Sequence, residues 1–141
     1  HLHGLEGQIH FLGWKSQTEL EAIYQEADIV VLPSLQETLP VVIAETMAAG
    51  RVMVSSAIGG VPEMIANNET GFTYSLRETG ALENILDTLY DNSVEIGRIG
   101  ENARRAAKDK FHADVIASST YEYYKQISVK TGIPAFPIFN I

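Results

Sequence analysis

The chain contains no cysteine, and its other scarcities also exclude classes of protein. Without cysteine, disulfides, thiolate zinc sites and a cysteine nucleophile are excluded, and a reducing compartment is favoured. Basic residues are scarce as well: 10 Lys and Arg stand against 18 Asp and Glu, and the net charge of −8 argues against a nucleic-acid partner. The apolar runs at Ile29–Leu32 and Leu39–Ala44 are far shorter than the ~20 residues that cross a bilayer. We therefore expect a cytoplasmic location.

Peripheral attachment to a membrane is the alternative location. It rests on a basic cluster in a predicted helix that could attract anionic lipid, made of Arg104, Arg105, Lys108 and Lys110.

The length and composition of the chain fit one globular domain. Its 141 residues are 45% hydrophobic and 20% charged, which is ordinary for a chain that folds around a core. The first residue is His1 rather than Met, so we expect residues 1–130 to form one domain that is truncated at its N-terminus. Residues 131–141 are mostly apolar but contain Pro134 and Pro137, and we expect them to form an extended tail.

Alternating strand and helix patterns run through the first half of the chain. Ser16-Gln-Thr-Glu19 is typical of a capping box and predicts a helix that ends near Ala27. The patterns also predict strands at 8–12, 28–34, 52–56 and 71–74, helices at about 39–50 and 61–66, and further helices from residue 79 onward. This order indicates an α/β fold with a parallel sheet, because parallel strands need crossover connections.

Two carboxylates stand out at the predicted carboxyl edge of this sheet, where open α/β sheets bind ligands. Glu37 lies in the loop after the second predicted strand, and Glu45 lies in a helix whose other residues are nearly all apolar. A helix that is apolar on all sides is expected to be buried. A carboxylate buried there needs hydrogen-bond donors, and no basic residue stands four positions from Glu45. Either a distant side chain or a ligand with hydroxyl groups must satisfy it.

The spacing of these residues favours a ligand that carries a diphosphate and a ribose. If the helix starts near Leu39, its free amides and its dipole form an anion site. Glu45 then lies about 7–9 Å farther along the helix axis, which resembles the step from a diphosphate to a ribose. A carboxylate can accept hydrogen bonds from both hydroxyls of a vicinal diol. Glu37, just before the helix, would face the group at the other end of the diphosphate.

Several segments resemble retaining GT-B glycosyltransferases, in particular glycosyltransferase family 4. The longest, Pro33-Ser-Leu-Gln-Glu37-Thr-Leu-Pro-Val-Val-Ile-Ala-Glu45-Thr-Met-Ala-Ala-Gly50, is similar to the E-x7-E segment of that family. Ile58-Gly-Gly-Val-Pro-Glu63 resembles its G-G-x-P-E turn, Thr70-Gly-Phe72 its next strand entry, and Ile9-His-Phe-Leu-Gly13 an upstream strand end. The resemblance covers residues 8–127. It implies a Rossmann-like parallel sheet with helices on both faces, part of a GT-B C-terminal domain, followed by C-terminal helices.

The resemblance also implies a function and a set of site residues. The chain would be the donor-binding half of a retaining glycosyltransferase that moves a sugar from a nucleotide diphosphate to a hydroxyl of a glycan, lipid or small-molecule acceptor. Glu37 would be the catalytic residue that contacts the sugar, and Glu45 would hold the ribose. The other donor-binding residues would be Thr38, Leu39, Pro40 and Val41 around the diphosphate, Gly13 and Trp14 beside the base, and Gly59 and Gly60. No cofactor and no metal are expected, and a missing N-terminal domain would be a partner.

Alternatives remain for one motif and for the whole chain. Gly59-Gly60 is equally well explained as a turn into the helix that Pro62 starts. The chain could instead be a non-catalytic nucleotide-sugar-binding or structural module, or a fragment of a GT-B sugar epimerase. A departing diphosphate needs cationic stabilisation, and Lys15 and Arg51 are the only Lys or Arg residues within 1–75. We therefore expect the 141 residues alone to be inactive.

Overall fold

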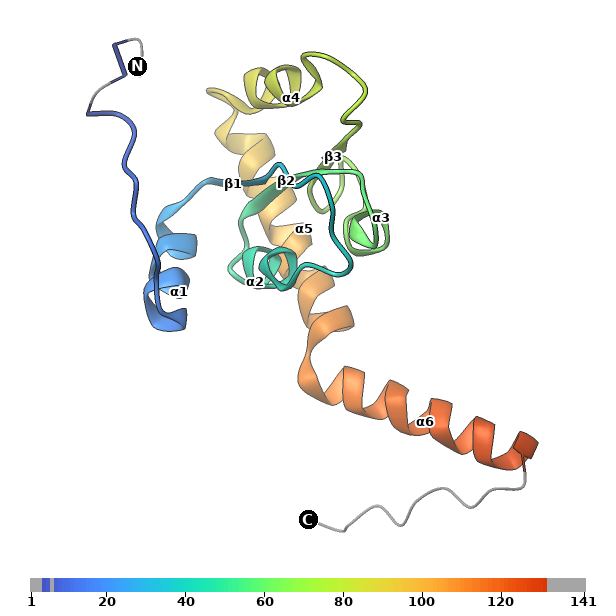
Figure 1. The fold of residues 1–141 in the computed structure, drawn as a ribbon. Coiled ribbons are helices and arrows are strands. Elements are labelled where there is room, and N and C mark those ends of the chain that lie inside the picture. The colour runs from blue at the N-terminus through green and yellow to red at the C-terminus, as the bar shows by residue number, and fades with distance from the viewer. Residues whose placement is uncertain (1–3, 6, 132–141) are drawn as a thin grey trace.

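A computed structural model describes residues 4, 5 and 7–131, and a three-stranded parallel sheet lies at its centre (Figure 1). The strands β1 (Ile29–Leu32), β2 (Val52–Ser56) and β3 (Phe72–Tyr74) are arranged in the order β1-β2-β3. Helix α2 (Val41–Ala48) connects β1 to β2, and helix α3 (Val61–Met64) connects β2 to β3. The predicted α/β class with a parallel sheet is confirmed.

Strand β2 is the centre of the core, and all its residues are buried. Val54 pairs with Val31 of β1 and with Phe72 of β3. Side chains alternate between the two faces of a strand. Met53 therefore packs on one face with α2 and α3, while Val54 packs on the other with α4 (Ala81–Leu89). Helices cover both faces of the sheet, as the resemblance implies.

Helix α5 (Ser93–Phe111) passes across the sheet and joins both core layers (Figure 1). Ile99 packs in the layer that contains α4, and Ala103, one turn later, packs in the layer that contains α2. The approach to α2 is close, because a Cβ on Gly100 would lie 2.3 Å from the carbonyl oxygen of Gly50. Gly50 follows the end of α2 with a φ of +72°, a conformation that glycine adopts without steric cost.

Helix α1 (Gln17–Glu26) begins at the predicted capping box. The backbone N–H of Ser16 donates to Glu19 Oε2 at 2.9 Å, and the N–H of Glu19 donates to Ser16 Oγ at 3.5 Å. Hydrogen bonds from Ser16 lower the pKa of the Glu19 carboxyl. Tyr24 is the buried residue of this helix, and Ala27 is its C-cap. The prediction for this helix is therefore confirmed at both ends.

Two predictions about local structure are wrong. Gln8–Leu12 is not a strand of the sheet: Phe11 is 85% exposed, and the segment before α1 runs apart from the sheet (Figure 1). An apolar run does not by itself supply the neighbouring strand that a sheet requires. Helix α2 is also not buried on all sides. Ile43 and Met47 are fully buried, but Val41 is 68% exposed, because only one side of the helix faces the core.

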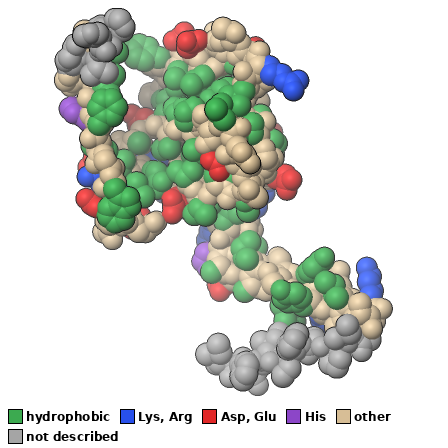
Figure 2. All heavy atoms as spheres, viewed as in Figure 1, with side chains coloured by type: hydrophobic (Ala, Val, Ile, Leu, Met, Phe, Trp, Pro, Cys, Tyr) green, Lys and Arg blue, Asp and Glu red, His purple; other side chains and the backbone are tan. Residues whose placement is uncertain are grey.

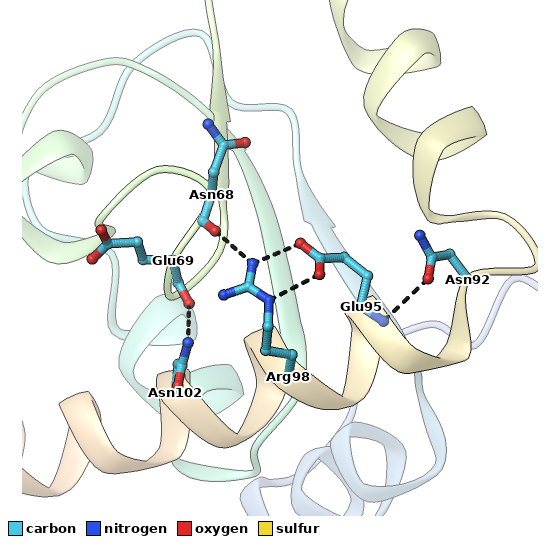
Figure 3. Close-up of polar contacts among 6 residues, drawn as sticks. All are labelled: Asn68, Glu69, Asn92, Glu95, Arg98 and Asn102. Carbon is cyan, nitrogen blue, oxygen red and sulfur yellow. Dashed lines mark hydrogen bonds and ion pairs between the residues drawn. The ribbon is translucent and has the colours of Figure 1, made fainter.

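Helix α5 also holds the turn between α3 and β3 (Figure 3). The Arg98 guanidinium pairs with Glu95 and donates to the backbone carbonyl of Asn68 at 3.0 Å. One turn later, the side-chain amide of Asn102 donates to the carbonyl of Glu69 at 3.0 Å. The hydrogen bond from Arg98 lowers the pKa of the Glu95 carboxyl. Asn68 has a φ of 63°, so these bonds stabilise a backbone conformation that side-chain-bearing residues rarely adopt.

Helix α6 (Ala113–Thr131) extends away from the sheet and has no buried residue (Figures 1 and 2). It carries exposed hydrophobic side chains, among them Ile116, Tyr121, Tyr123 and Tyr124. Within the described part of the chain, none of the helices combines the length and hydropathy needed to span a bilayer. The tail predicted at 131–141 lies, from residue 132 onward, outside the described residues. The domain boundaries and the location in the cell stay predictions.

Candidate functional site

The candidate site lies at the carboxyl ends of the strands, where three loops follow β1, β2 and β3 at 33–40, 57–60 and 75–80. Two serines at the end of β2 hold the first loop. Ser55 Oγ donates to the carbonyl of Leu32 at 3.2 Å, and Ser56 Oγ donates to the carbonyl of Ser34 at 2.6 Å. Both serines are fully buried. Their hydroxyls are therefore shielded from water, and the two bonds tie the end of β1 and the start of the loop to β2.

Glu37 lies in this first loop and is half-buried. Ser34 Oγ donates to Glu37 Oε1 at 2.7 Å. Ser34 thus accepts a hydrogen bond from Ser56 at its carbonyl and donates one to Glu37 from its hydroxyl. An ionised carboxylate has about four acceptor positions, so Glu37 can accept further hydrogen bonds from a hydroxylated ligand.

Gly59 and Gly60 pack directly against the backbone of the Glu37 loop. The N–H of Gly60 donates to the carbonyl of Thr38 at 2.8 Å. A Cβ on Gly59 would lie 2.0 Å from the carbonyl oxygen of Glu37, and a Cβ on Gly60 would lie 2.5 Å from that of Thr38. Gly60 is also the N-cap of α3, as expected for a turn into that helix. The glycines therefore allow the second loop to support the first, and their contact with a donor stays a prediction.

Helix α2 begins at Val41, two residues later than predicted, with Pro40 as its N-cap. No side chain caps it; the N–H of Ile43 donates to the carbonyl of Pro40 at 3.1 Å, whereas the amides of the first two residues, Val41 and Val42, precede the first bond of the helix. Leu39 is 60% exposed at this end, so the amides lie close to the surface. The helix start can therefore receive an anion from solvent. Glu45 lies four residues after Val41, about 6 Å along the axis, which is shorter than a start at Leu39 predicts.

Glu45 is not isolated, because helix α1 supplies two donors to its carboxylate. Gln17 Nε2 donates to Glu45 Oε1 at 2.9 Å, and the Tyr24 hydroxyl donates to Glu45 Oε2 at 3.3 Å. Of the two possibilities that the sequence left open, the structure has the distant side chains. Burial and the nearby charge of Glu45 raise the pKa of the Tyr24 hydroxyl, which keeps it protonated as a donor.

Gly13 and Trp14 precede Gln17 by four and three residues, so the chain connects them to the end of the site near Glu45. Trp14 is 87% exposed, and Gly13 has a φ of +65° in open space. An exposed indole face can stack on an aromatic ring of a ligand. The predicted position of Gly13 and Trp14 beside the base of a nucleotide stays a prediction.

The two early basic side chains are engaged away from Glu37. Lys15 Nζ lies 3.7 Å from Glu19 Oε1. The Arg51 guanidinium donates to the carbonyl of Gln25 near the end of α1. Arg51 follows the C-terminal end of α2, whereas Glu37 precedes its N-terminal end. Across the described residues, no cluster of three or more Asp, Glu, His or Cys could hold a metal ion.

Sequence reasoning missed four side chains that shape the site: Gln17, Tyr24, Ser34 and Ser56. Tyr24 lies in the helix that the capping box predicts, but no local pattern shows which residue of another helix it meets. For Gln17 and the two serines the sequence carries no signal beyond their positions at the ends of predicted elements.

The fold and this arrangement define an α/β domain of the Rossmann-like type found in GT-B glycosyltransferases. Residues 1–106 match the family model of "Glycosyl transferases group 1", and the chain belongs to that family. The family resemblance seen in the sequence is therefore confirmed for group 1, while the assignment to family 4 stays a prediction.

Several known proteins are similar to this chain. The D-inositol 3-phosphate glycosyltransferase of Corynebacterium glutamicum is 35% identical over 105 residues, which is 74% of this chain and 25% of the relative. Sucrose-phosphate synthase of Thermosynechococcus elongatus superimposes with a TM-score of 0.80 at 26% identity, over 92% of this chain and 32% of that structure. HepE of Anabaena in complex with UDP gives a TM-score of 0.79 at 27% identity, over 87% of this chain and 34% of that structure. The same protein has been solved with UDP-glucose. The chain thus spans a quarter to a third of these proteins.

Proposed function

We propose that the chain is the donor-binding half of a retaining glycosyltransferase that moves a sugar from a nucleotide diphosphate to an acceptor hydroxyl. One observation carries this proposal. The start of α2, which no side chain caps, lies between Glu37 and Glu45, and hydrogen bonds orient the carboxylates of both residues. This order matches the order of sugar, diphosphate and ribose in a nucleotide sugar. The similarity to HepE, which has been solved with UDP and with UDP-glucose, supports the same class of ligand.

In this proposal the diphosphate binds at the start of α2, where the amides around Leu39 and Val41 and the helix dipole stabilise negative charge. Glu45 accepts hydrogen bonds from the ribose hydroxyls. Glu37 contacts the transferred sugar and is the catalytic residue. The backbone between Glu37 and Glu45 is held by Thr38 and Pro40 and is supported by Gly59 and Gly60. The base is bordered by Gly13 and Trp14.

Catalysis in this proposal is electrostatic. The departing diphosphate gains negative charge in the transition state, and the helix start stabilises it without a cofactor. The acceptor, a glycan, a lipid or a small molecule, binds to polypeptide outside these residues, which also excludes water from the closed site.

A non-catalytic nucleotide-sugar-binding module is the second candidate, and one observation favours it. Lys15 and Arg51 are both engaged away from Glu37, so the Lys and Arg residues of 1–75 give the leaving diphosphate no cation. The two candidates make the same prediction for binding and opposite predictions for turnover by the complete protein.

Titration calorimetry with UDP, GDP and ADP and their glucose conjugates tests the binding that both candidates share. Glu45→Gln should weaken binding about ten- to hundredfold, because hydrogen bonds to a charged acceptor contribute roughly 1.5–3 kcal/mol. Glu101→Gln removes an exposed carboxylate of α5 and is the matched control, which should leave the dissociation constant unchanged. Equal dissociation constants for a folded Glu45→Gln variant and the wild type would reject the proposed role of Glu45. A transfer assay on the complete protein then separates the two candidates. A retaining transferase should give a product in which NMR shows the anomeric configuration of glucose retained, and a binding module should give no product.

A further inference from the structure

Helix α1 contacts the Glu45 carboxylate through two residues on one of its faces. Gln17 is the first residue of α1 and Tyr24 follows seven positions later, so the two side chains project from the same side of the helix. Each donates to a different oxygen of Glu45, at 2.9 Å and 3.3 Å. The plane of the carboxylate is therefore held at both oxygens, although the side chain is only half-buried.

The position of α1 that makes these contacts is itself fixed at both ends. The Ser16–Glu19 capping box defines the first turn, which contains Gln17. At the other end, Arg51 donates to the carbonyl of Gln25, so the residue that follows α2 and Gly50 also holds the end of α1. Tyr24 between them is only 8% exposed, which restricts its ring to one orientation. Helices α1 and α2 are in contact and lie beside each other (Figure 1).

The hydrogen bonds leave part of the carboxylate available. Of about four acceptor positions on an ionised carboxylate, Gln17 and Tyr24 each occupy one. The free positions can accept two hydroxyl groups from a diol, provided that the carboxylate does not rotate. Rotation would remove the alignment even if the charge remained in place.

We propose that Tyr24 and Gln17 are positioning residues that orient Glu45 toward the vicinal diol of a nucleoside, so that selection of ribose over 2′-deoxyribose depends on helix α1. The inference rests on the proposed function, because it assumes that Glu45 meets the ribose. Neither residue needs to touch the nucleotide. Their removal should reduce the preference for ribose more than the affinity that comes from the diphosphate.

The test compares dissociation constants for UDP, GDP and ADP with those for their 2′-deoxy counterparts, measured by calorimetry on the full chain. The measured quantity is the ratio of the deoxy to the ribo dissociation constant for each base that binds. We expect about tenfold preference for ribose in the wild type, since a 2′ hydroxyl donates to a charged acceptor. Tyr24→Phe and Gln17→Ala should each lower the ratio about threefold, and Glu45→Gln should lower it to about one. A merely structural role would lower both affinities and leave the ratio unchanged.

Two control variants test the specificity of the effect. Tyr90→Phe removes a hydroxyl from a residue that is 77% exposed, and Thr18→Ala changes the exposed neighbour of Gln17. Both should keep the wild-type ratio. Gln17→Glu places a second carboxylate beside Glu45 and should lower the ratio further than Gln17→Ala at pH 7. If Tyr24→Phe fails to fold, the two exposed variants at Gln17 still decide the question.

The outcomes separate this inference from the proposed function. A ratio that collapses in Glu45→Gln but stays at the wild-type value in Tyr24→Phe, Gln17→Ala and Gln17→Glu overturns the inference and leaves the role of Glu45 intact. A ratio that does not change in Glu45→Gln overturns both. Failure of the wild-type chain to bind any of the six diphosphates also overturns both.

Discussion

Replacing Gly59 with alanine should displace the loop that carries Glu37. The new Cβ would lie 2.0 Å from the Glu37 carbonyl oxygen, and ordinary contact begins at about 3.4 Å, so one of the two backbones must move by more than an ångström. Gly59 also has a φ of +49°, which costs a residue with a Cβ about 1–2 kcal/mol. Ala57, two residues before Gly59, is tied to β3 because its N–H donates to the carbonyl of Tyr74 at 2.8 Å. Gln36 and Thr38 beside Glu37 are exposed, so we expect the Glu37 loop to give way.

The consequence for binding depends on what the ligand contacts. If Glu37 meets the sugar, the shift removes a hydrogen bond to a charged group, which corresponds to roughly a ten- to hundredfold loss of affinity for UDP-glucose. Bare UDP, which reaches only the helix start and Glu45, should lose much less.

Calorimetry with both ligands measures this difference, and thermal unfolding measures the cost in stability. Gly97→Ala is the matched control, because it adds the same methyl group to an exposed helical position with nothing within 4 Å. It should raise stability by about 0.5–1 kcal/mol and leave both affinities unchanged. A folded Gly59→Ala variant that binds UDP-glucose as tightly as the wild type would refute the coupling between the two loops.

Three further predictions concern other contacts. Glu37→Ala should lower sugar transfer by the complete enzyme far more than binding of bare UDP, and equal losses in kinetic and calorimetric assays would reject the separate roles of Glu37 and Glu45. Ser16→Ala should destabilise the fold by about 1 kcal/mol in denaturant unfolding. The pKa of Glu19 is lowered in the folded state, so the stability that its ionised carboxylate contributes should be present above its ordinary pKa of 4.5 and be lost as the pH falls through the folded pKa. A loss of stability in Ser16→Ala that grows toward acidic pH would contradict this prediction. Arg98→Ala should speed hydrogen exchange at the Asn68 amide, which donates to the carbonyl of Gly71 at 2.9 Å. An unchanged exchange rate would show that the turn between α3 and β3 is stable without Arg98.

The parts of the fold that depend on local sequence were predictable. A capping box requires two side chains three residues apart, and it specified the start of α1 correctly. The segment at 52–56 indicated a buried strand, and all residues of β2 are buried. The start of α2 was predicted two residues too early, because Pro40 is compatible with both the N-cap and the first turn.

The parts that depend on distant contacts were not predictable. Gln8–Leu12 has the composition of a strand, but pairing is decided by a neighbour and not by composition. Glu45 finds its donors on α1, and no sequence pattern links Gln17 to Glu45, which lies 28 positions later. The close approach of Gly59 to Glu37 is likewise a property of how two loops pack, and the sequence shows only a glycine pair that is also typical of a turn.

The central claim is that the segment from Glu37 to Glu45 binds a nucleotide sugar. The most direct measurement is an NMR titration of the ¹⁵N-labelled 15.5 kDa chain with UDP-glucose, GDP-glucose and ADP-glucose. We predict saturable shifts at the amides of Leu39, Val41 and Val42 and in the loop of Gly59 and Gly60 with at least one of these ligands. Saturable shifts confined to other surfaces, or none at millimolar ligand, would contradict the account.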